Sequence, residues 1–295
     1  MKEKKHKSGF ITIMGNPNVG KSTLMNSLMG LDLSIITHKA QTTRHRILGI
    51  VNGDNYQMVL SDTPGIIKPA YEMQNSMMSF VKEAINDADI LIYMASIDET
   101  IIKDDLLFKK IQNSKIPVIV LINKIDISNQ EKVSQSLRSW EELIPNASIY
   151  SISALTGFFI PELVEILKNH LPEGPQYFPK DQITDRPERF FVNEAVRENI
   201  FTNYSKEIPY SVEVNTEEFL EDEKIIRIRS IINVERESQK GIIIGNKGKA
   251  LKKVGMNTRK KLEKFFEKKI HIELYVKVLK KWRSNSNQLK RFGYN

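Results

Sequence analysis

Short apolar runs alternate with stretches of helical spacing along the first half of the chain. Four apolar runs have the length of buried strands: residues 10–14, 90–95, 117–122 and 148–152. Helical spacing follows such runs at residues 21–29 and 161–170. Strands that are apolar on both faces are typical of parallel sheets covered by helices. The pattern predicts an α/β domain with a mostly parallel, doubly wound sheet over residues 10–171.

Two local signals add elements to this domain. The β-prone runs 49–51 and 56–60 flank a turn-rich tetrapeptide at residues 52–55, which predicts a hairpin. Ser128 with Glu131 three residues later matches a capping box, and it predicts the start of a helix. Both elements fit the α/β order.

The second half of the chain has a different order of elements. Helical spacing between Val192 and Ile200 is followed by β-prone runs at residues 210–215 and 224–234. Two helical segments come next, the second at residues 258–268, and residues 270–278 form a last apolar run. The order α-β-β-α-α-β predicts a separate α+β domain.

Length and composition place the domain boundaries. A chain of 295 residues favours two domains. Proline and glycine in residues 172–187 predict a linker between a first domain at 10–171 and a second at 188–280. Residues 1–9 are expected to be a basic N-terminal tail and residues 281–295 a C-terminal tail.

The charge is unevenly distributed along the chain. Residues 1–175 carry 18 Lys and Arg against 19 Asp and Glu, whereas residues 176–295 carry 26 against 17. We therefore expect the second domain to bind an anionic macromolecule. The chain has no cysteine, which excludes disulfides and thiolate metal sites, and it has no apolar run of membrane-spanning length.

Residues 15–22, GNPNVGKS, match the phosphate-binding pattern G-x-x-x-x-G-K-[ST] between a predicted strand and a predicted helix. Glycine leaves room for backbone N–H groups to surround a phosphate, and the helix dipole attracts the same anion. Lys21 is expected to reach the β- and γ-phosphates, and the Ser22 hydroxyl is expected to ligate Mg²⁺.

Three further motifs complete a nucleotide site. The DTPG motif at residues 62–65 offers a carboxylate that can hold Mg²⁺ through water and a glycine N–H for the γ-phosphate. The NKID motif at residues 123–126 offers an Asp that can accept N1–H and N2–H of guanine, a donor pair that adenine lacks. Ser153-Ala154 can present an N–H to guanine O6, and Thr42 or Thr43 can ligate Mg²⁺ from a mobile loop.

These motifs resemble the small GTPases of the translation-factor class, and residues 40–46, AQTTRHR, resemble the switch segment of the Era family. The resemblance implies slow GTP hydrolysis and gives the Mg²⁺ role to Thr43. Ile66 stands where Ras-type proteins have a water-orienting glutamine. Asn18 matches an asparagine that helps to bind K⁺ in relatives with this loop, so K⁺ is a second expected cofactor beside Mg²⁺.

The expected site residues of the first domain fall into three groups. The GTP-binding group is Gly15, Asn16, Pro17, Asn18, Val19, Gly20, Lys21, Ser22, Thr23, Asp62, Thr63, Pro64, Gly65, Asn123, Lys124, Asp126, Ser153 and Ala154. The catalytic group is Lys21, Thr43 and Gly65. The metal group is Ser22, Thr43 and Asp62 for Mg²⁺, with Asp62 acting through water, and Asn18 for K⁺.

A G-x-x-G loop at residues 245–248 lies between the two helical segments of the second domain, which then resembles a type II KH domain. In KH domains this loop clamps the backbone of four single-stranded nucleotides. The expected RNA-binding residues are Ile243, Ile244, Gly245, Asn246, Lys247, Gly248, Lys249, Lys252 and Lys253, with the two isoleucines as the apolar surface for bases. Further matches to the Era family are residues 183–186, 234–237, 273–278 and 292–294.

The resemblance implies a GTPase switch that binds the 3′ end of single-stranded small-subunit ribosomal RNA and assists assembly of the small ribosomal subunit. A monomer in the cytoplasm is expected, with weak peripheral contact to the inner face of the cell membrane. Two alternatives stay open: a GTPase acting on a different RNA or ribosomal particle, and an RNA-binding protein in which the nucleotide is mainly structural. The NKID motif and the KH pattern disfavour a P-loop kinase of a small metabolite.

Overall fold

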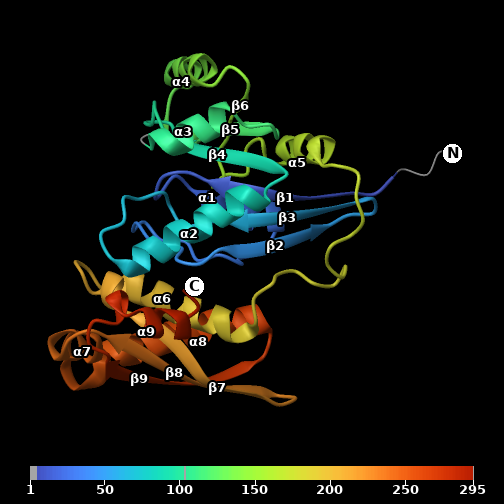
Figure 1. Cartoon of the computed structure of the whole chain (residues 1–295). Coiled ribbons are helices and arrows are strands. Elements are labelled where there is room, and N and C mark those ends of the chain that lie inside the picture. The colour runs from blue at the N-terminus through green and yellow to red at the C-terminus, as the bar shows by residue number, and fades with distance from the viewer. Residues whose placement is uncertain (1–4, 103, 295) are drawn as a thin grey trace. The chain divides into compact units, whose positions relative to one another are not determined.

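A computed structural model describes residues 5–102 and 104–294 (Figure 1). Residues 1–4 of the expected N-terminal tail and residue 295 of the expected C-terminal tail lie outside the described residues. The chain divides into two compact units. Among the described residues, the first consists of residues 5–34, 43–68, 77–102 and 104–185, and the second of residues 35–42, 69–76 and 186–294.

The first unit is built on a six-stranded sheet. Its strands are β1 (Lys7–Met14), β2 (Ile47–Asn52), β3 (Tyr56–Asp62), β4 (Ile90–Ser96), β5 (Val118–Asn123) and β6 (Ser148–Ser151). Their order in the sheet is β2-β3-β1-β4-β5-β6, and all neighbours are parallel except the β2–β3 hairpin. The predicted doubly wound α/β fold and its hairpin are therefore confirmed.

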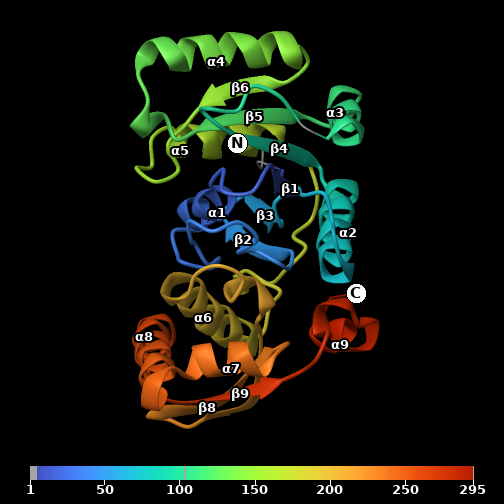
Figure 2. The same ribbon diagram turned by 90° about the vertical axis from the view of Figure 1, so that its left-hand side faces the viewer.

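Helices cover both faces of this sheet. They are α1 (Lys21–Met29), α2 (Glu72–Asp87), α3 (Asp105–Gln112), α4 (Gln130–Leu143) and α5 (Ile160–His170). Figure 2 shows α2 and α3 on one side of the strands and α1 on the other. The Asn129 side chain caps α4 by accepting a hydrogen bond from Lys132 N at 2.9 Å. The predicted capping box at Ser128 is therefore wrong by one residue, because the carboxamide oxygen of Asn129 accepts the free N–H at the start of α4.

Two boundaries of the first unit differ from the predictions. β1 begins at Lys7, which pairs with Tyr56, so residues 7–9 form a strand and not a tail. The predicted linker also packs on the sheet as far as Asp185, because Ile50 N donates to Ile183 O at 2.9 Å and Gln57 Oε1 accepts from Tyr177 N and Phe178 N at 2.8 Å and 3.0 Å. The segment satisfies polar groups along the edge strand β2, which an exposed edge would leave unpaired.

The second unit is an α+β domain. Its elements are α6 (Glu188–Asn203), β7 (Glu213–Glu221), β8 (Ile225–Val234), α7 (Glu237–Ile244), α8 (Lys249–Phe266), β9 (Lys269–Val278) and α9 (Ser286–Arg291). The sheet order is β7-β8-β9, with β7 antiparallel and β9 parallel to β8. Figures 1 and 2 show α6, α7 and α8 on one face of this sheet. The predicted order α-β-β-α-α-β is confirmed.

Two predicted ranges in this unit are wrong. The strand expected at residues 210–215 starts at Glu213, because residues 209–211 form a short 3₁₀ turn. The helix expected at residues 258–268 is the second half of α8, which begins at Lys249 and has no break. One long helix therefore joins the glycine loop to β9.

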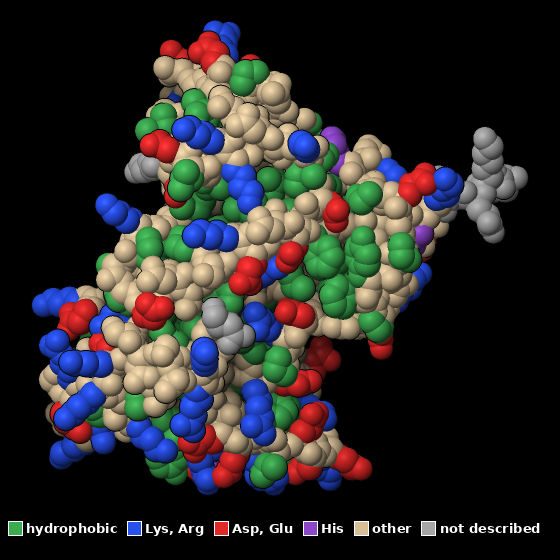
Figure 3. Space-filling view, in the orientation of Figure 1, with side chains coloured by type: hydrophobic (Ala, Val, Ile, Leu, Met, Phe, Trp, Pro, Cys, Tyr) green, Lys and Arg blue, Asp and Glu red, His purple; other side chains and the backbone are tan. Residues whose placement is uncertain are grey.

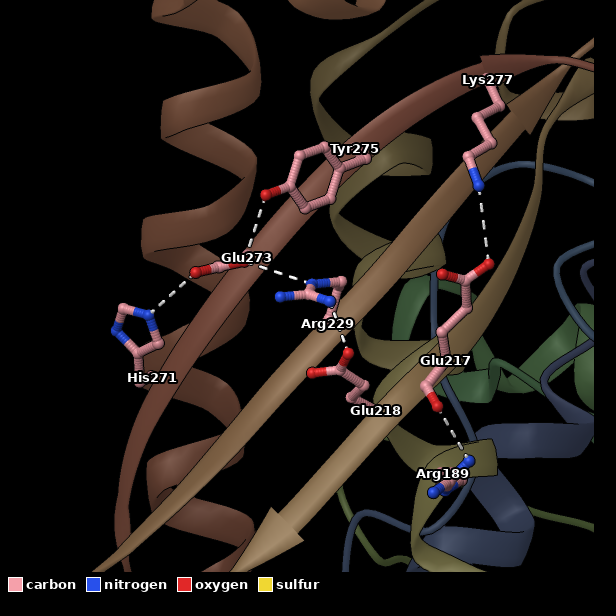
Figure 4. A network of polar contacts seen from close by, with 8 residues as sticks. All are labelled: Arg189, Glu217, Glu218, Arg229, His271, Glu273, Tyr275 and Lys277. Carbon is pink, nitrogen blue, oxygen red and sulfur yellow. Dashed lines mark hydrogen bonds and ion pairs between the residues drawn. The ribbon is translucent and has the colours of Figure 1, made fainter.

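The opposite face of this sheet carries charged side chains that pair across the strands (Figure 4). Arg229 lies between Glu218 and Glu273, and its Nε is 3.4 Å from a Glu273 oxygen. The Tyr275 hydroxyl donates to Glu273 at 3.2 Å, and this bond together with Arg229 holds the pKa of Glu273 below its ordinary value. Because these side chains are exposed, each pair contributes little stability.

The expected C-terminal tail is folded. Trp282 is fully buried and donates from Nε1 to Ser211 O at 3.0 Å. Tyr294 is also buried, and its hydroxyl donates to Glu213 Oε2 at 2.7 Å. The prediction of a separate tail after residue 280 is wrong, because these aromatic side chains complete the packing of the second unit. Within the described residues, no helix combines the length and the apolar character needed to span a bilayer.

Candidate functional site

The phosphate-binding loop lies between the end of β1 at Met14 and the start of α1 at Lys21. Gly20 has a φ of +105°, and a Cβ at this position would lie 2.3 Å from Asn123 Nδ2. The same Asn123 amide donates to Val19 O at 2.7 Å. Glycine is therefore required here, because the loop turns with positive φ directly against the NKID motif.

Lys21 lies inside this loop. Its Nζ donates to Asn16 O at 2.9 Å and to Gly15 O at 3.2 Å, and its side chain is buried. Burial lowers the pKa of Lys21 to about 8, while the charges of Asp62 and Glu99 act in the opposite direction. The ammonium group thus occupies the space where the loop would surround phosphate oxygens.

Three oxygen-bearing side chains meet at the start of α1. Ser22 Oγ donates to Asp62 Oδ2 at 2.7 Å and lies 2.9 Å from Thr43 Oγ1. Asp62 Oδ1 is buried without a hydrogen-bond partner among the described residues. Burial raises the pKa of Asp62, and the Ser22 hydrogen bond opposes this shift. Two hydroxyls and one carboxylate, whose Oδ1 is unpaired, suit the hard cation Mg²⁺, so these residues fit the predicted ligand set.

The loop after β3 approaches the phosphate-binding loop closely. A Cβ on Gly65 would lie 2.8 Å from Pro17 Cα, so this approach requires glycine. Thr63 donates its hydroxyl to Ile13 O at 2.8 Å, and Pro64 is buried beside it. Ile66 packs against a buried core cluster and therefore offers no polar group to a water molecule.

The predicted base-binding residues lie together at the ends of β5 and β6. Asn123 Oδ1 accepts from Ala154 N at 2.9 Å, and Ser153 Oγ donates to Asp126 Oδ1 at 2.6 Å. Lys124 has a φ of +69° in the tight turn between them. Asp126 is exposed, so its carboxylate is accessible to a guanine edge. Two motifs that are separate in the sequence therefore lie side by side in the fold.

The remaining predicted residues of the loop lie at its surface or on the first helical turn. Asn18 is exposed at the tip of the loop with a φ of +64°, and Thr23 follows Ser22 in α1. Glu99, a residue that the sequence did not single out, accepts a hydrogen bond from Asn16 Nδ2 at 3.2 Å. Its position in the turn after β4 carries no motif, which explains why the sequence pattern missed it.

The boundary between the two units falls within the predicted switch segment, between Thr42 and Thr43. In the second unit, Arg197 of α6 is buried and donates from Nη2 to Thr42 O at 2.5 Å, while its Nε pairs with Glu194. Lys39 donates to the carbonyls of Phe201 and Tyr204 at the end of α6. The residue that precedes the expected Mg²⁺ ligand is therefore held by a buried arginine.

A groove of about 470 Å³ lies between α8 and β9 in the second unit. The G-x-x-G loop forms one end of it, and Gly245, Lys247 and Gly248 there have φ values of +70°, +50° and +75°. The groove is lined by Gly248, Leu251, Lys252, Gly255, Met256 and Arg259 from the loop and α8, and by Ile270, His271, Ile272 and Leu274 from β9. Apolar walls with Lys and Arg at the rim suit bases and phosphates.

The structure changes the predicted RNA-binding set. Ile243 is fully buried in the core of the second unit, so the prediction that it offers a surface to bases is wrong. Ile244 is partly buried against the same core. Leu251 and Met256, which the sequence analysis missed, line the groove instead. Their spacing from Gly248 along one face of α8 is a signal that would have found them, had the helix been recognised from Lys249 onward.

The lysines that were predicted to bind RNA are exposed. Lys247, Lys249, Lys252 and Lys253 are exposed, as is Asn246 at the tip of the loop, and of these Lys252 belongs to the groove lining. Figure 3 shows Lys and Arg side chains gathered around α7 on the visible face of the second unit. Lys252 and Arg259 in the groove lining, with the exposed lysines of the loop, give the groove the positive charge that a nucleic-acid interface requires.

Comparison with protein families gives two matches. Residues 10–124 match the model described as 50S ribosome-binding GTPase, and residues 207–283 match the KH domain. The GTPase Era of Syntrophus aciditrophicus is 46% identical over 292 residues, covering 98% of this chain and 95% of that protein. The GTPase Era of Clostridium kluyveri is 43% identical over 290 residues, covering 98% and 99%.

Two solved structures are similar over the whole chain. One is Era in complex with MgGDPNP and nucleotides 1506–1542 of 16S ribosomal RNA, with 38% identity, a TM-score of 0.93 and coverage of 98% of this chain and 99% of that one. The other is a variant of Aquifex aeolicus Era bound to GDP·AlF4⁻, with 38% identity, a TM-score of 0.94 and the same coverage. Identity at this level across both units, together with the nucleotide-site geometry, shows that the chain belongs to the Era family of GTPases, which hydrolyse GTP to GDP and phosphate.

Proposed function

We propose that this GTPase binds the 3′ end of small-subunit ribosomal RNA in the groove between α8 and β9 and assists assembly of the small ribosomal subunit. The main support is the groove itself, with apolar walls, a G-x-x-G loop and Lys252 at its rim. A relative that is 38% identical over 98% of this chain carries nucleotides 1506–1542 of 16S ribosomal RNA. RNA recognition by a KH module and nucleotide control by a GTPase unit then act in one polypeptide.

In the proposed reaction, Lys21 leaves the carbonyls of Gly15 and Asn16 and binds the β- and γ-phosphates. Ser22 and Thr43, with Asp62 acting through water, would hold Mg²⁺, which would supply positive charge for the phosphate oxygens. Gly65 donates its backbone N–H to the γ-phosphate. Ile66 cannot orient the attacking water, so backbone groups or a partner do so, and intrinsic turnover is slow.

The bound nucleotide then controls the switch segment. Thr43 would help to hold Mg²⁺ in the GTP-bound protein, and Thr42, its neighbour in the chain, accepts a hydrogen bond from Arg197 of α6. A change at Thr43 therefore reaches a helix of the second unit through one peptide bond and one hydrogen bond. Hydrolysis releases Thr43, and we propose that the affinity of the second unit for RNA falls as a result.

We propose that K⁺ supports hydrolysis through Asn18. This side chain is exposed at the tip of the phosphate-binding loop, and Ile66 leaves the site without a polar side chain after Gly65. An added cation would stabilise charge that develops on the phosphates. Equal kcat values in sodium and potassium buffers would contradict this role, and Asn18→Ala should abolish any difference between the two buffers.

We further propose that the protein acts as a monomer in the cytoplasm, with weak peripheral contact to the inner face of the cell membrane. The basic surface of the second unit supports attraction to anionic lipid headgroups as well as to RNA. Sedimentation velocity tests the monomer. Flotation with vesicles containing anionic lipid, in the presence and absence of competing RNA, tests the membrane contact.

The alternative target of this GTPase is a different ribosomal particle. The family model for residues 10–124 is described by its binding to the 50S ribosome, which favours the large subunit as the alternative target. Pull-down of purified small and large subunits with the GTP-bound protein separates the two. Retention of the large subunit alone would replace the small-subunit proposal and leave the GTPase assignment unchanged.

The decisive experiment is filter binding of an oligoribonucleotide that corresponds to the 3′ end of small-subunit ribosomal RNA. The protein is loaded with GDP or with GDPNP. Tighter binding with GDPNP is expected. Equal binding in the two states would remove the proposed coupling, and absence of binding in both would contradict the proposed RNA target. A steady-state phosphate-release assay on the same sample separates a switch from a protein in which nucleotide is only structural.

A further inference from the structure

Glu99 lies in a rigid turn that follows β4. Its backbone N donates to Ser96 O at 2.9 Å. Its backbone carbonyl accepts from Trp140 Nε1 at 3.1 Å, and Trp140 is fully buried in α4. Both backbone groups of Glu99 are thus hydrogen-bonded within the first unit, which fixes the point from which its side chain extends.

The Glu99 carboxylate contacts the phosphate-binding loop. One oxygen, Oε1, accepts from Asn16 Nδ2 at 3.2 Å. The other, Oε2, is buried without a hydrogen-bond partner among the described residues, and so is the hydroxyl of Tyr93. A carboxylate with a buried, unpaired oxygen keeps much of its charge unscreened. This charge lies one hydrogen bond from the loop that surrounds the phosphates.

Lys21 provides the link between Glu99 and the nucleotide. Lys21 Nζ donates to the carbonyl of Asn16, whose side chain is bound to Glu99. Glu99 and the Lys21 ammonium are therefore joined through Asn16 by two hydrogen bonds. When phosphates arrive, the same carboxylate faces several negative charges.

We propose that Glu99 weakens the binding of guanine nucleotide to the phosphate-binding loop and thereby speeds its spontaneous release. The hydrogen bond from Asn16 stabilises the conformation of the loop, and the negative charge of Glu99 repels the phosphates. Its effect is larger for a triphosphate than for a diphosphate, because the triphosphate brings one more charged group to the loop. The inference rests on the nucleotide site and is independent of the RNA target.

Glu99→Gln separates the two roles. A glutamine side chain has the same shape, keeps an oxygen that can accept from Asn16, and offers an amide to the Tyr93 hydroxyl. The charge alone is removed. We expect the rate of GDP dissociation to fall about fivefold, as for one unit charge acting across several ångströms at a half-buried site. The rate for GDPNP should fall by a larger factor.

The assay is release of fluorescent GDP and GDPNP derivatives after addition of excess unlabelled nucleotide, with the full chain and Mg²⁺. Asp98→Asn is the matched control. Asp98 is exposed in the same turn and pairs with Lys132, and its substitution removes the same negative charge. We expect it to leave both rates within about twofold of the wild type. Release from Glu99→Gln that is as fast as from the wild type, or equal slowing by Asp98→Asn, would overturn the inference. Damage to the fold would speed release and lower the thermal midpoint, so it cannot imitate the expected result.

Discussion

Nucleotide binding should take up a proton at mildly alkaline pH. Burial lowers the pKa of Lys21 to about 8 in the nucleotide-free protein. Bound phosphates favour the charged ammonium, so the pKa of Lys21 rises in the complex. At pH 7 Lys21 is protonated in both states, and binding leaves its proton unchanged. Above pH 8 the free protein has lost that proton and must regain it on binding.

The magnitude follows from the pKa. With a pKa of about 8, about three quarters of Lys21 is neutral at pH 8.5, so binding of GDP should take up about three quarters of a proton. The same linkage makes the affinity for GDP about fourfold weaker at pH 8.5 than at pH 7.0, which is a loss of about 0.8 kcal/mol. Below pH 7.5 the affinity should be nearly constant.

Isothermal titration calorimetry of GDP in buffers that differ in ionisation enthalpy measures the proton uptake directly. Lys21→Arg is the control, because arginine stays charged at these pH values. The Lys21→Arg variant is titrated at higher protein concentration to offset its weaker binding of GDP. Any proton uptake that this variant retains belongs to groups other than Lys21. Uptake at pH 8.5 that is zero, or equal in the wild type and the arginine variant, would refute the reasoning. It would mean that Lys21 stays fully protonated in the free loop.

Three further predictions test the base site, the groove and the C-terminal packing. Asp126→Asn should weaken GTP binding by about a hundredfold and favour xanthosine triphosphate, whose O2 needs a donor; nucleotide competition measures this. Lys252→Ala should lower the salt slope of RNA binding by about one unit, whereas Lys264→Ala, on α8 outside the groove lining, should leave it unchanged. Tyr294→Phe removes the hydrogen bond that Tyr294 donates to the buried Glu213, and should destabilise the protein by about 1–3 kcal/mol in denaturant titrations.

Each of these has a contrary outcome. Unchanged GTP affinity in Asp126→Asn would show that this side chain does not contact the base. Equal slopes for the two lysine variants would remove the groove rim from the RNA interface. An unchanged denaturation midpoint in Tyr294→Phe would mean that the residues after 280 are not part of the cooperative unit.

The nucleotide site was largely predictable because its motifs are short and local. A phosphate-binding loop needs glycine, lysine and a hydroxyl at fixed spacing, and each motif comes directly after a strand. Since parallel strands end at one edge of the sheet, side chains far apart in sequence meet there. Ser22 and Asp62 lie 2.7 Å apart for this reason, although 40 residues separate them.

The errors arose where partners are distant in sequence. Ile243 looked like an apolar surface beside the glycine loop, but tertiary packing buries it in the core. Residues after 280 looked like a polar tail, yet Trp282 and Tyr294 find buried partners on residues 211 and 213. Composition could not reveal these partners, because each contact joins positions about 70 to 80 residues apart.

The sequence by itself determined the fold class, the order of elements and the identity of the nucleotide-binding groups, since these depend on periodicity and local spacing. Only the tertiary structure decided which side chains line the groove and which charge faces the phosphates. Leu251 and Met256 are exposed to the groove because α8 lies beside β9. Glu99 reaches Asn16 because β4 neighbours β1 in the sheet. Such contacts follow from the packing of elements, which local sequence does not encode.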